Sequence, residues 1–155
     1  RPQIVCLSNE AVGSDHLQIW LDKLSHSDTP SVICVDLPED GKSLTGHAMV
    51  DRRIALLSIE QNAWVLASKD DRCIVVCSKT ELDWAIKHNE ICVWAPSKII
   101  LDATEPPKGP VSDTLGLAVW LGHNLNAKHV VAIGPFDSDF DDPLILFHVI
   151  EADAL

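Results

Sequence analysis

The chain has 155 residues, 46% of them hydrophobic, which is enough for one domain with its own core. Its formal net charge of -11 argues against nucleic acid or an anionic membrane surface as a partner, because both attract lysine and arginine. No apolar run approaches transmembrane length, and no signal peptide precedes the first predicted strand. Since the chain begins at Arg1 rather than methionine, we expect an excised domain or a processed product.

Apolar runs alternate along the chain with segments of helical periodicity. Strands are predicted at residues 3–7, 32–35, 73–77, 91–96 and 129–134, and a sixth, with a short helix as the alternative, at 144–150. Helices are predicted at 17–24, 54–67, 79–87 and 113–123, with loops at 8–15, 39–46, 105–110 and 136–143. Residues 99–101 either extend the fourth strand or form a separate short piece. This order predicts a single three-layer α/β/α domain with a mostly parallel sheet of five or six strands.

All the cysteines lie in or beside these predicted strands, where a free cysteine behaves as a small buried hydrophobic residue: Cys6, Cys34, Cys73, Cys77 and Cys92. Their odd number does not fit the disulfide framework of a small secreted domain, so we expect free thiols in a reducing cytoplasm. The tryptophans on apolar helix faces are likewise predicted to be core residues: Trp20, Trp64, Trp84 and Trp120.

The segment 72–84 carries the clearest functional signal. Its apolar run predicts a strand buried on both faces, and helical periodicity begins directly after Ser78. Such a turn lies at the carboxyl ends of parallel strands, where open α/β folds bind their ligands. A nucleophilic serine at this turn needs very small residues two places before and after it, whereas the chain has Val76 and Thr80. Helix capping is therefore the favoured interpretation of Ser78.

A catalytic triad would also need an acid and a histidine. Asp142, or Asp139, follows a predicted strand and could be the acid. The available histidines fit less well, because His148 lies in an apolar run and His16 lies in the first loop, where it could instead contact a ligand.

The acidic segment 137–142 begins like a calcium loop but lacks its glycine and its final glutamate, so we expect a solvated loop. Zinc-ligand spacing and a phosphate-binding glycine loop are also missing from the sequence. We therefore predict neither a metal nor a cofactor.

Several short segments, in order along the chain, are similar to one known family. They are Gly13-Ser14-Asp15-His16 followed by Trp20, a second strand ending at Asp36-Leu37-Pro38, the strand and helix around Ser78, and the segments 93–96 and 130–143. This set resembles the small serine hydrolases related to retinoblastoma-binding protein 9, which are single-domain α/β-hydrolase folds. The resemblance implies that Asp142 stands in the place of the catalytic acid.

The departures from that family fall on its catalytic parts. Cys77 replaces a histidine before the serine, Thr80 replaces a glycine after it, and the C-terminal catalytic histidine has no counterpart. The resemblance therefore implies a degenerate scaffold on which Ser78 and Asp142 are vestigial. We predict a non-catalytic binding or assembly module that takes a protein partner, a second copy or a small ligand. The expected binding residues, all near the carboxyl ends of the strands, are Ser14, His16, Asp36 and Cys77.

Two alternatives stay open. The first is a working esterase that uses Ser78 and Asp142, with His16 or His148 as an unconventional base. The second is a pseudo-receiver domain, because Asp36-Leu37-Pro38 resembles the phosphoacceptor strand end of a response regulator. A sheet of strand order 2-1-3-4-5 would support the second alternative.

Overall fold

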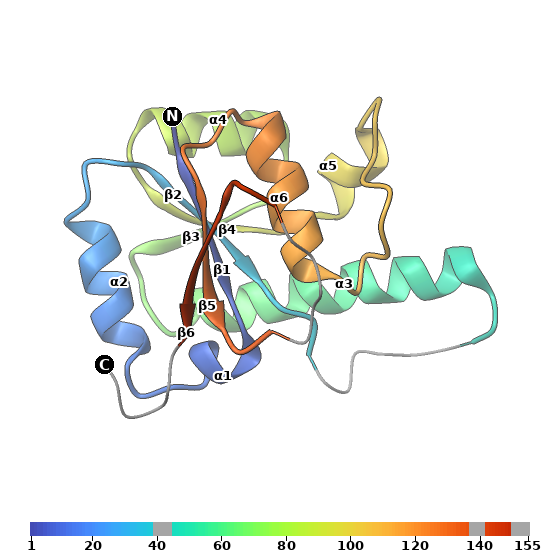
Figure 1. Ribbon diagram of the computed structural model, residues 1–155, viewed down its shortest axis with the longest axis horizontal. Helices are drawn as coiled ribbons and strands as arrows, with labels where there is room; N and C mark the ends of the chain where they lie inside the picture. Colours follow the sequence, from blue (N-terminus) through green and yellow to red (C-terminus); the bar gives the residue numbers. More distant parts are fainter. Residues whose placement is uncertain (39–44, 137–141, 150–155) are drawn as a thin grey trace.

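A computed structural model describes residues 1–38, 45–136 and 142–149 (Figure 1). Six strands form one sheet in the order β3-β4-β2-β1-β5-β6, and every neighbouring pair is parallel. The strands are β1 (Gln3–Leu7), β2 (Ser31–Val35), β3 (Cys73–Val76), β4 (Ile91–Trp94), β5 (Val130–Gly134) and β6 (Ile145–Val149). The predicted α/β class is confirmed, and the last apolar run is a strand. The order differs from 2-1-3-4-5, so it gives no support to a receiver-like domain.

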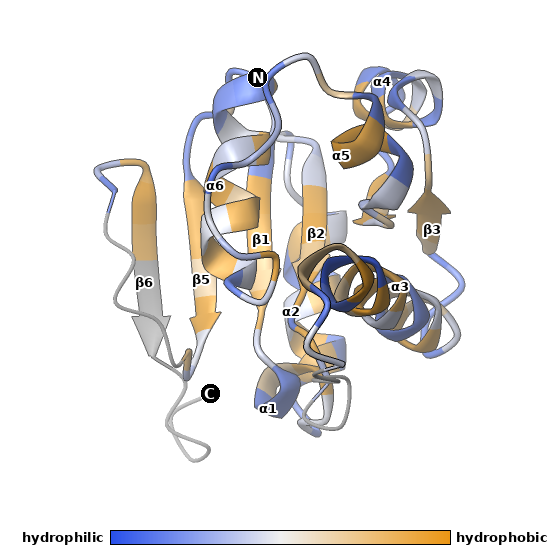
Figure 2. Ribbon diagram, turned by 90° about the vertical axis from the view of Figure 1, so that its right-hand side faces the viewer, coloured by the Kyte–Doolittle hydropathy of each residue, from blue (hydrophilic) through white to orange (hydrophobic). Residues whose placement is uncertain are grey.

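Helices flank this sheet on both faces, consistent with three layers. They are α1 (Asn9–Val12), α2 (Leu17–Ser25), α3 (Ala48–Ala67), α4 (Lys79–Lys87), α5 (Ser97–Asp102) and α6 (Thr114–Asn124). Figures 1 and 2 show α3, α5 and α6 on one side of the sheet and α2 on the other. No helix in the described part of the chain has both the length and the apolarity to cross a membrane.

Three helical segments differ from the sequence-based expectation. The predicted loop 8–15 contains α1, because the side chain of Ser8 accepts a hydrogen bond from the backbone of Ala11 and so caps a single turn. Residues 97–102 form α5, so the uncertain piece at 99–101 is helical. Helix α3 begins at Ala48, six residues before the predicted start. Its first turns contact little of the core, so they show no one-sided periodicity by which the sequence could reveal them.

The core lies on both faces of the sheet, and Figure 2 shows the central strands β1, β2 and β5 as largely hydrophobic. Trp94 is buried in this core, and Trp20 and Trp120 pack against it. Trp64 and Trp84 are 59% and 51% exposed, so the prediction that they are core residues is wrong. Their neighbours Ala63 and Ala85 are buried, so each tryptophan points away from the side of its helix that packs on the core.

All five cysteines are free thiols, as predicted. Four are buried, and Cys77 is half-buried. Burial raises the pKa of Cys73 to about 11 and that of Cys92 to about 12, so both remain protonated thiols at neutral pH. Most of the predicted loop 39–46 and most of the acidic segment 137–142 lie outside the described residues.

Candidate functional site

Ser78 follows β3, the outermost strand on one side of the sheet, and it begins α4. Its Oγ accepts a hydrogen bond from the backbone N–H of Glu81 at 3.2 Å and donates one to Glu81 Oε1, also at 3.2 Å. The predicted helix cap is therefore present. Within the described residues, the hydroxyl hydrogen-bonds only to Glu81, so no imidazole is positioned to take its proton.

Cys77 stands beside this serine, but its surroundings suppress thiolate formation. Partial burial raises the pKa of the Cys77 thiol, and the nearby carboxylates of Glu81 and Glu60 raise it further. A reactive cysteine needs the opposite environment, with positive charge that stabilises the thiolate. Cys77 therefore lies close to Ser78 without forming a nucleophilic pair with it.

Asp142 lies at the other end of the molecule from Ser78. It lies three residues before the first residue of β6, the outermost strand on the opposite side of the sheet, so it sits near the amino ends of the strands. Asp142 Oδ1 accepts a hydrogen bond from the Leu144 backbone at 2.9 Å, and Oδ2 meets His123 Nε2 at 3.3 Å. The Leu144 N–H, and secondarily His123, lower the pKa of this carboxyl group. The structure does not bring the predicted serine and acid together.

The histidine that meets Asp142 was not among the sequence candidates. His123 lies in the last turn of α6, which ends near the amino end of β5. The side chain of His148 is not among those that the structure describes. His16 is the residue before α2, near the carboxyl ends of the strands. No signal in the sequence pairs residues 123 and 142, because their contact depends on how α6 and β6 pack at one end of the sheet.

Asp36 holds three elements together at the carboxyl end of β2. Its Oδ1 accepts hydrogen bonds from Thr114 Oγ1 at 2.7 Å and from the Leu37 backbone at 2.8 Å. Its backbone carbonyl accepts a hydrogen bond from Asn62 Nδ2 at 2.9 Å. These bonds link β2 to α6 and α3, and they engage one oxygen, Oδ1, of the carboxylate that was predicted to bind a ligand.

A crevice at the carboxyl ends of β1 and β5 does unite two predicted residues. The chain leaves β1 toward β2 and leaves β5 toward β6, and such divergence opens a ligand crevice in open α/β sheets. A cavity of about 300 Å³ lies here, and its lining includes Ser14, Asp15, His16 and Gly134. Ser14 Oγ accepts a hydrogen bond from the His16 backbone at 3.1 Å. Asp36, Cys77 and Ser78 are not among the residues that line it.

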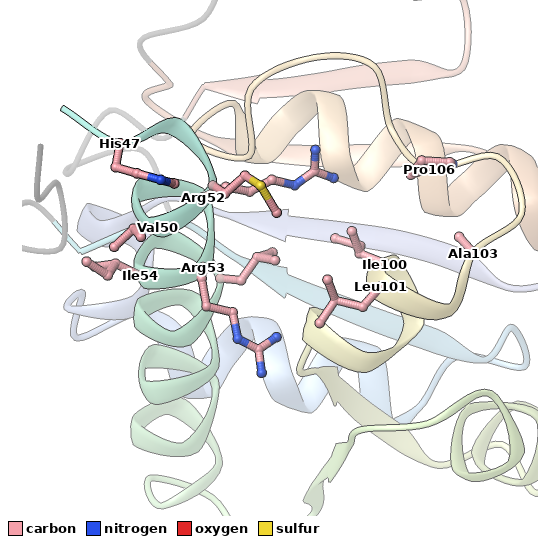
Figure 3. Close-up of a pocket in the computed structure, with 11 residues that line it drawn as sticks. His47, Val50, Arg52, Arg53, Ile54, Ile100, Leu101, Ala103 and Pro106 are labelled. Atoms are coloured by element: carbon pink, nitrogen blue, oxygen red, sulfur yellow. The ribbon is translucent and has the colours of Figure 1, made fainter. Parts of the chain in front are cut away.

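A groove between α3 and α5, which we call the α3–α5 groove, has a volume of about 760 Å³ and was not anticipated from the sequence (Figure 3). Its floor and walls are almost entirely apolar, with Met49 and Leu56 from α3 and Ile100 and Leu101 from α5. Met49 is 79% exposed and Leu101 is 57% exposed, so apolar surface of both helices faces solvent in one place. Met49 lies in the part of α3 that the sequence analysis missed, and Ile100 and Leu101 lie in the segment that it left undecided, whereas Leu56 belongs to the predicted helix.

Positive charge borders the α3–α5 groove. Arg52 and Arg53 both line it, and Figure 3 shows their guanidinium groups on either side of the apolar lining. Neither guanidinium has an ion-pair partner among the described carboxylates, and no carboxylate lines the groove. In a chain of net charge -11, an apolar groove with two unpaired arginines is a distinct local environment.

A scan against protein-family models finds no match, and no curated protein matches the chain. Within the described residues, no group of three or more histidine, cysteine, aspartate and glutamate side chains is placed to hold a metal ion. The functional argument therefore depends on the geometry of the site itself.

Proposed function

We propose that this protein is a non-catalytic binding module and that the α3–α5 groove is its binding surface for a partner protein. The observation that carries the proposal is the combination of exposed apolar side chains with unpaired arginines in one concave place. Apolar surface drives association when it is removed from water, and charges at its border select the partner and its orientation.

The charges of the groove favour an amphipathic segment that carries carboxylates. An apolar face of such a segment would cover Met49 and Leu101, while its acidic residues would meet Arg52 and Arg53 in charge-assisted hydrogen bonds. Helix-in-groove recognition works in this way, with apolar anchors spaced three or four residues apart. Because the chain has a net charge of -11, its field would repel an acidic segment elsewhere and leave this groove as the favourable place.

The surroundings of Ser78 support a binding role over hydrolysis. Its hydroxyl is engaged with Glu81 at the start of α4, and Asp142 lies near the opposite ends of the strands. A working esterase would need both a base and an acid within reach of the serine. No observation favours this second function. Absence of fluorophosphonate labelling on well-folded protein is the expected result, and labelling that disappears in Ser78→Ala would overturn the proposal of a non-catalytic module.

Binding can be measured with designed probes before a natural partner is known. Fluorescence polarisation would compare two labelled amphipathic helices that share their apolar face, one with glutamates and the other with lysines on the flanks. We expect the acidic peptide to bind and the basic one to bind at least about 10-fold more weakly. Arg52→Glu and Arg53→Glu should weaken binding of the acidic peptide. Lys87→Glu, at the exposed end of the distant helix α4, should leave that binding unchanged. Equal binding of both peptides, or no effect of the arginine variants, would contradict the proposal.

A further inference from the structure

The crevice at the carboxyl ends of β1 and β5 is separate from the α3–α5 groove, and the two share no lining residue. The chain leaves β1 toward β2 on one side and leaves β5 toward β6 on the other. Loops that diverge in this way leave room between them, and open α/β sheets bind their ligands there. Helix α1 packs against both strands at this point and contributes to the lining (Figure 1). The crevice therefore has the position of a small-molecule site.

The size and the walls of the cavity limit what it can hold. Its volume of about 300 Å³ lies at the lower end of the range for small-molecule sites, which is about 300–1,000 Å³. One wall is the bare backbone of Gly134, since a Cβ there would lie 2.9 Å from both the ring and the backbone nitrogen of Phe136. Most of the other lining residues have polar or charged side chains. We therefore expect a compact, polar ligand.

The charge of the cavity is negative, opposite to that of the α3–α5 groove. Glu10 on α1 and Asp15 in the following loop both line it, and both are exposed. Neither carboxylate forms an ion pair within the described part of the chain, and none of the lining residues that the structure describes is lysine or arginine. Two uncompensated carboxylates beside a cavity favour a ligand that carries a positive charge.

Two further side chains of the lining have unused hydrogen-bonding capacity. Ser14 Oγ accepts a hydrogen bond from the His16 backbone at 3.1 Å, which leaves the hydroxyl hydrogen of Ser14 able to donate. His16 Nδ1 is buried and has no hydrogen-bond partner among the described residues, an arrangement that lowers stability unless a further group pairs with it. The lining thus offers a hydroxyl donor and an imidazole beside the two carboxylates. A ligand that matches it needs an oxygen acceptor as well as a cationic donor.

We propose that this crevice binds a small amino alcohol, whose ammonium group is held by Glu10 and Asp15 and whose hydroxyl oxygen accepts a hydrogen bond from Ser14. The inference concerns a different surface from the α3–α5 groove and does not rest on the proposed function. A metal ion is not the favoured occupant, because the carboxylates and imidazole of the lining are not placed to share one. A neutral polyol would leave both carboxylates without a countercharge, and an anionic ligand would be repelled by them.

Titrations followed by ¹H–¹⁵N HSQC spectra of the full chain test the proposal with matched probes. Serinol differs from glycerol, and glucosamine from glucose, by an ammonium group in place of one hydroxyl. We expect each amine to bind at least about 10-fold more tightly than its alcohol, because hydrogen bonds to charged groups are stronger than neutral ones. The amides of residues 13–16 and of Gly134 should show the largest shifts.

Charge-removing variants of nearly unchanged shape identify the residues that bind the ammonium. Glu10→Gln and Asp15→Asn should each weaken binding of the amines at least about 10-fold and leave the weak binding of the alcohols nearly unchanged. Both carboxylates are exposed, so the variants should keep the thermal unfolding of the wild type. Asp71→Asn is the matched control, because it removes the same charge from an exposed residue just before β3, at the amino ends of the strands.

Three results would overturn the proposal. The first is the absence of shifts in the amides of the crevice when either amine is added at millimolar concentration. The second is equal binding of amines and alcohols, which would mean that the carboxylates do not select the ligand. The third is an equal effect of Asp71→Asn and the two crevice variants, since a general loss of negative charge would then explain the weakening.

Discussion

Replacing Ser78 by alanine and by asparagine separates a capping role from a catalytic one. Alanine removes the oxygen that accepts the Glu81 N–H at 3.2 Å, and such a loss at a helix N-cap costs about 1 kcal/mol of unfolding free energy. For a chain of this size, that cost lowers the midpoint of thermal unfolding by about 2–4 °C. Asparagine caps helices as well as serine does but has no hydroxyl nucleophile, so we expect Ser78→Asn to keep the wild-type midpoint.

The assay is thermal unfolding followed by circular dichroism, with hydrolysis of short acyl esters measured on the same three samples. We expect any background hydrolysis to be equal in the three proteins. If Ser78→Ala were as stable as the wild type, the capping argument would fail. If Ser78→Ala and Ser78→Asn both lost an activity that the wild type has, Ser78 would be a nucleophile despite its contacts with Glu81.

Three further predictions follow from particular contacts. Hydrogen bonds from Arg72 lower the pKa of Asp70, so this pair stabilises the fold above about pH 4, and the contribution is lost as the pH falls through the lowered pKa. In urea unfolding, the free energies of unfolding of the wild type and Asp70→Asn should therefore differ more at pH 7 than at pH 2.5. Thr114→Val removes the hydroxyl that donates to Asp36 and should lower the free energy of unfolding by about 2 kcal/mol, whereas Thr114→Ser retains the hydroxyl and should keep most of the stability. Equal losses for the two variants in urea unfolding would contradict this prediction. Iodoacetamide should modify half-buried Cys77 before the four buried thiols, as peptide mass spectrometry would show, and simultaneous labelling of all five would argue against the described burial.

Local patterns were sufficient for the elements that build the centre of the sheet. The apolar runs of β1, β2 and β5 are buried on both faces, so continuous hydrophobic sequence identifies them directly. The Ser78 cap was also readable, because a capping contact spans only three residues. Helix α3 was harder to delimit, since its first turns lack the one-sided periodicity on which such predictions depend.

The sequence by itself determined the class of fold and the alternation of strands and helices, because both follow from burial patterns within a few residues. It also placed Ser14 and His16 after the first strand, at the end of the sheet where open α/β folds in general bind their ligands. Only the tertiary structure decided which of the candidate residues lie close together. The strand order puts Ser78 and Asp142 on opposite outermost strands, near opposite strand ends, and it creates the pair of Asp142 with His123. The α3–α5 groove is likewise decided by which side of α3 the sheet covers, and no local pattern fixes this.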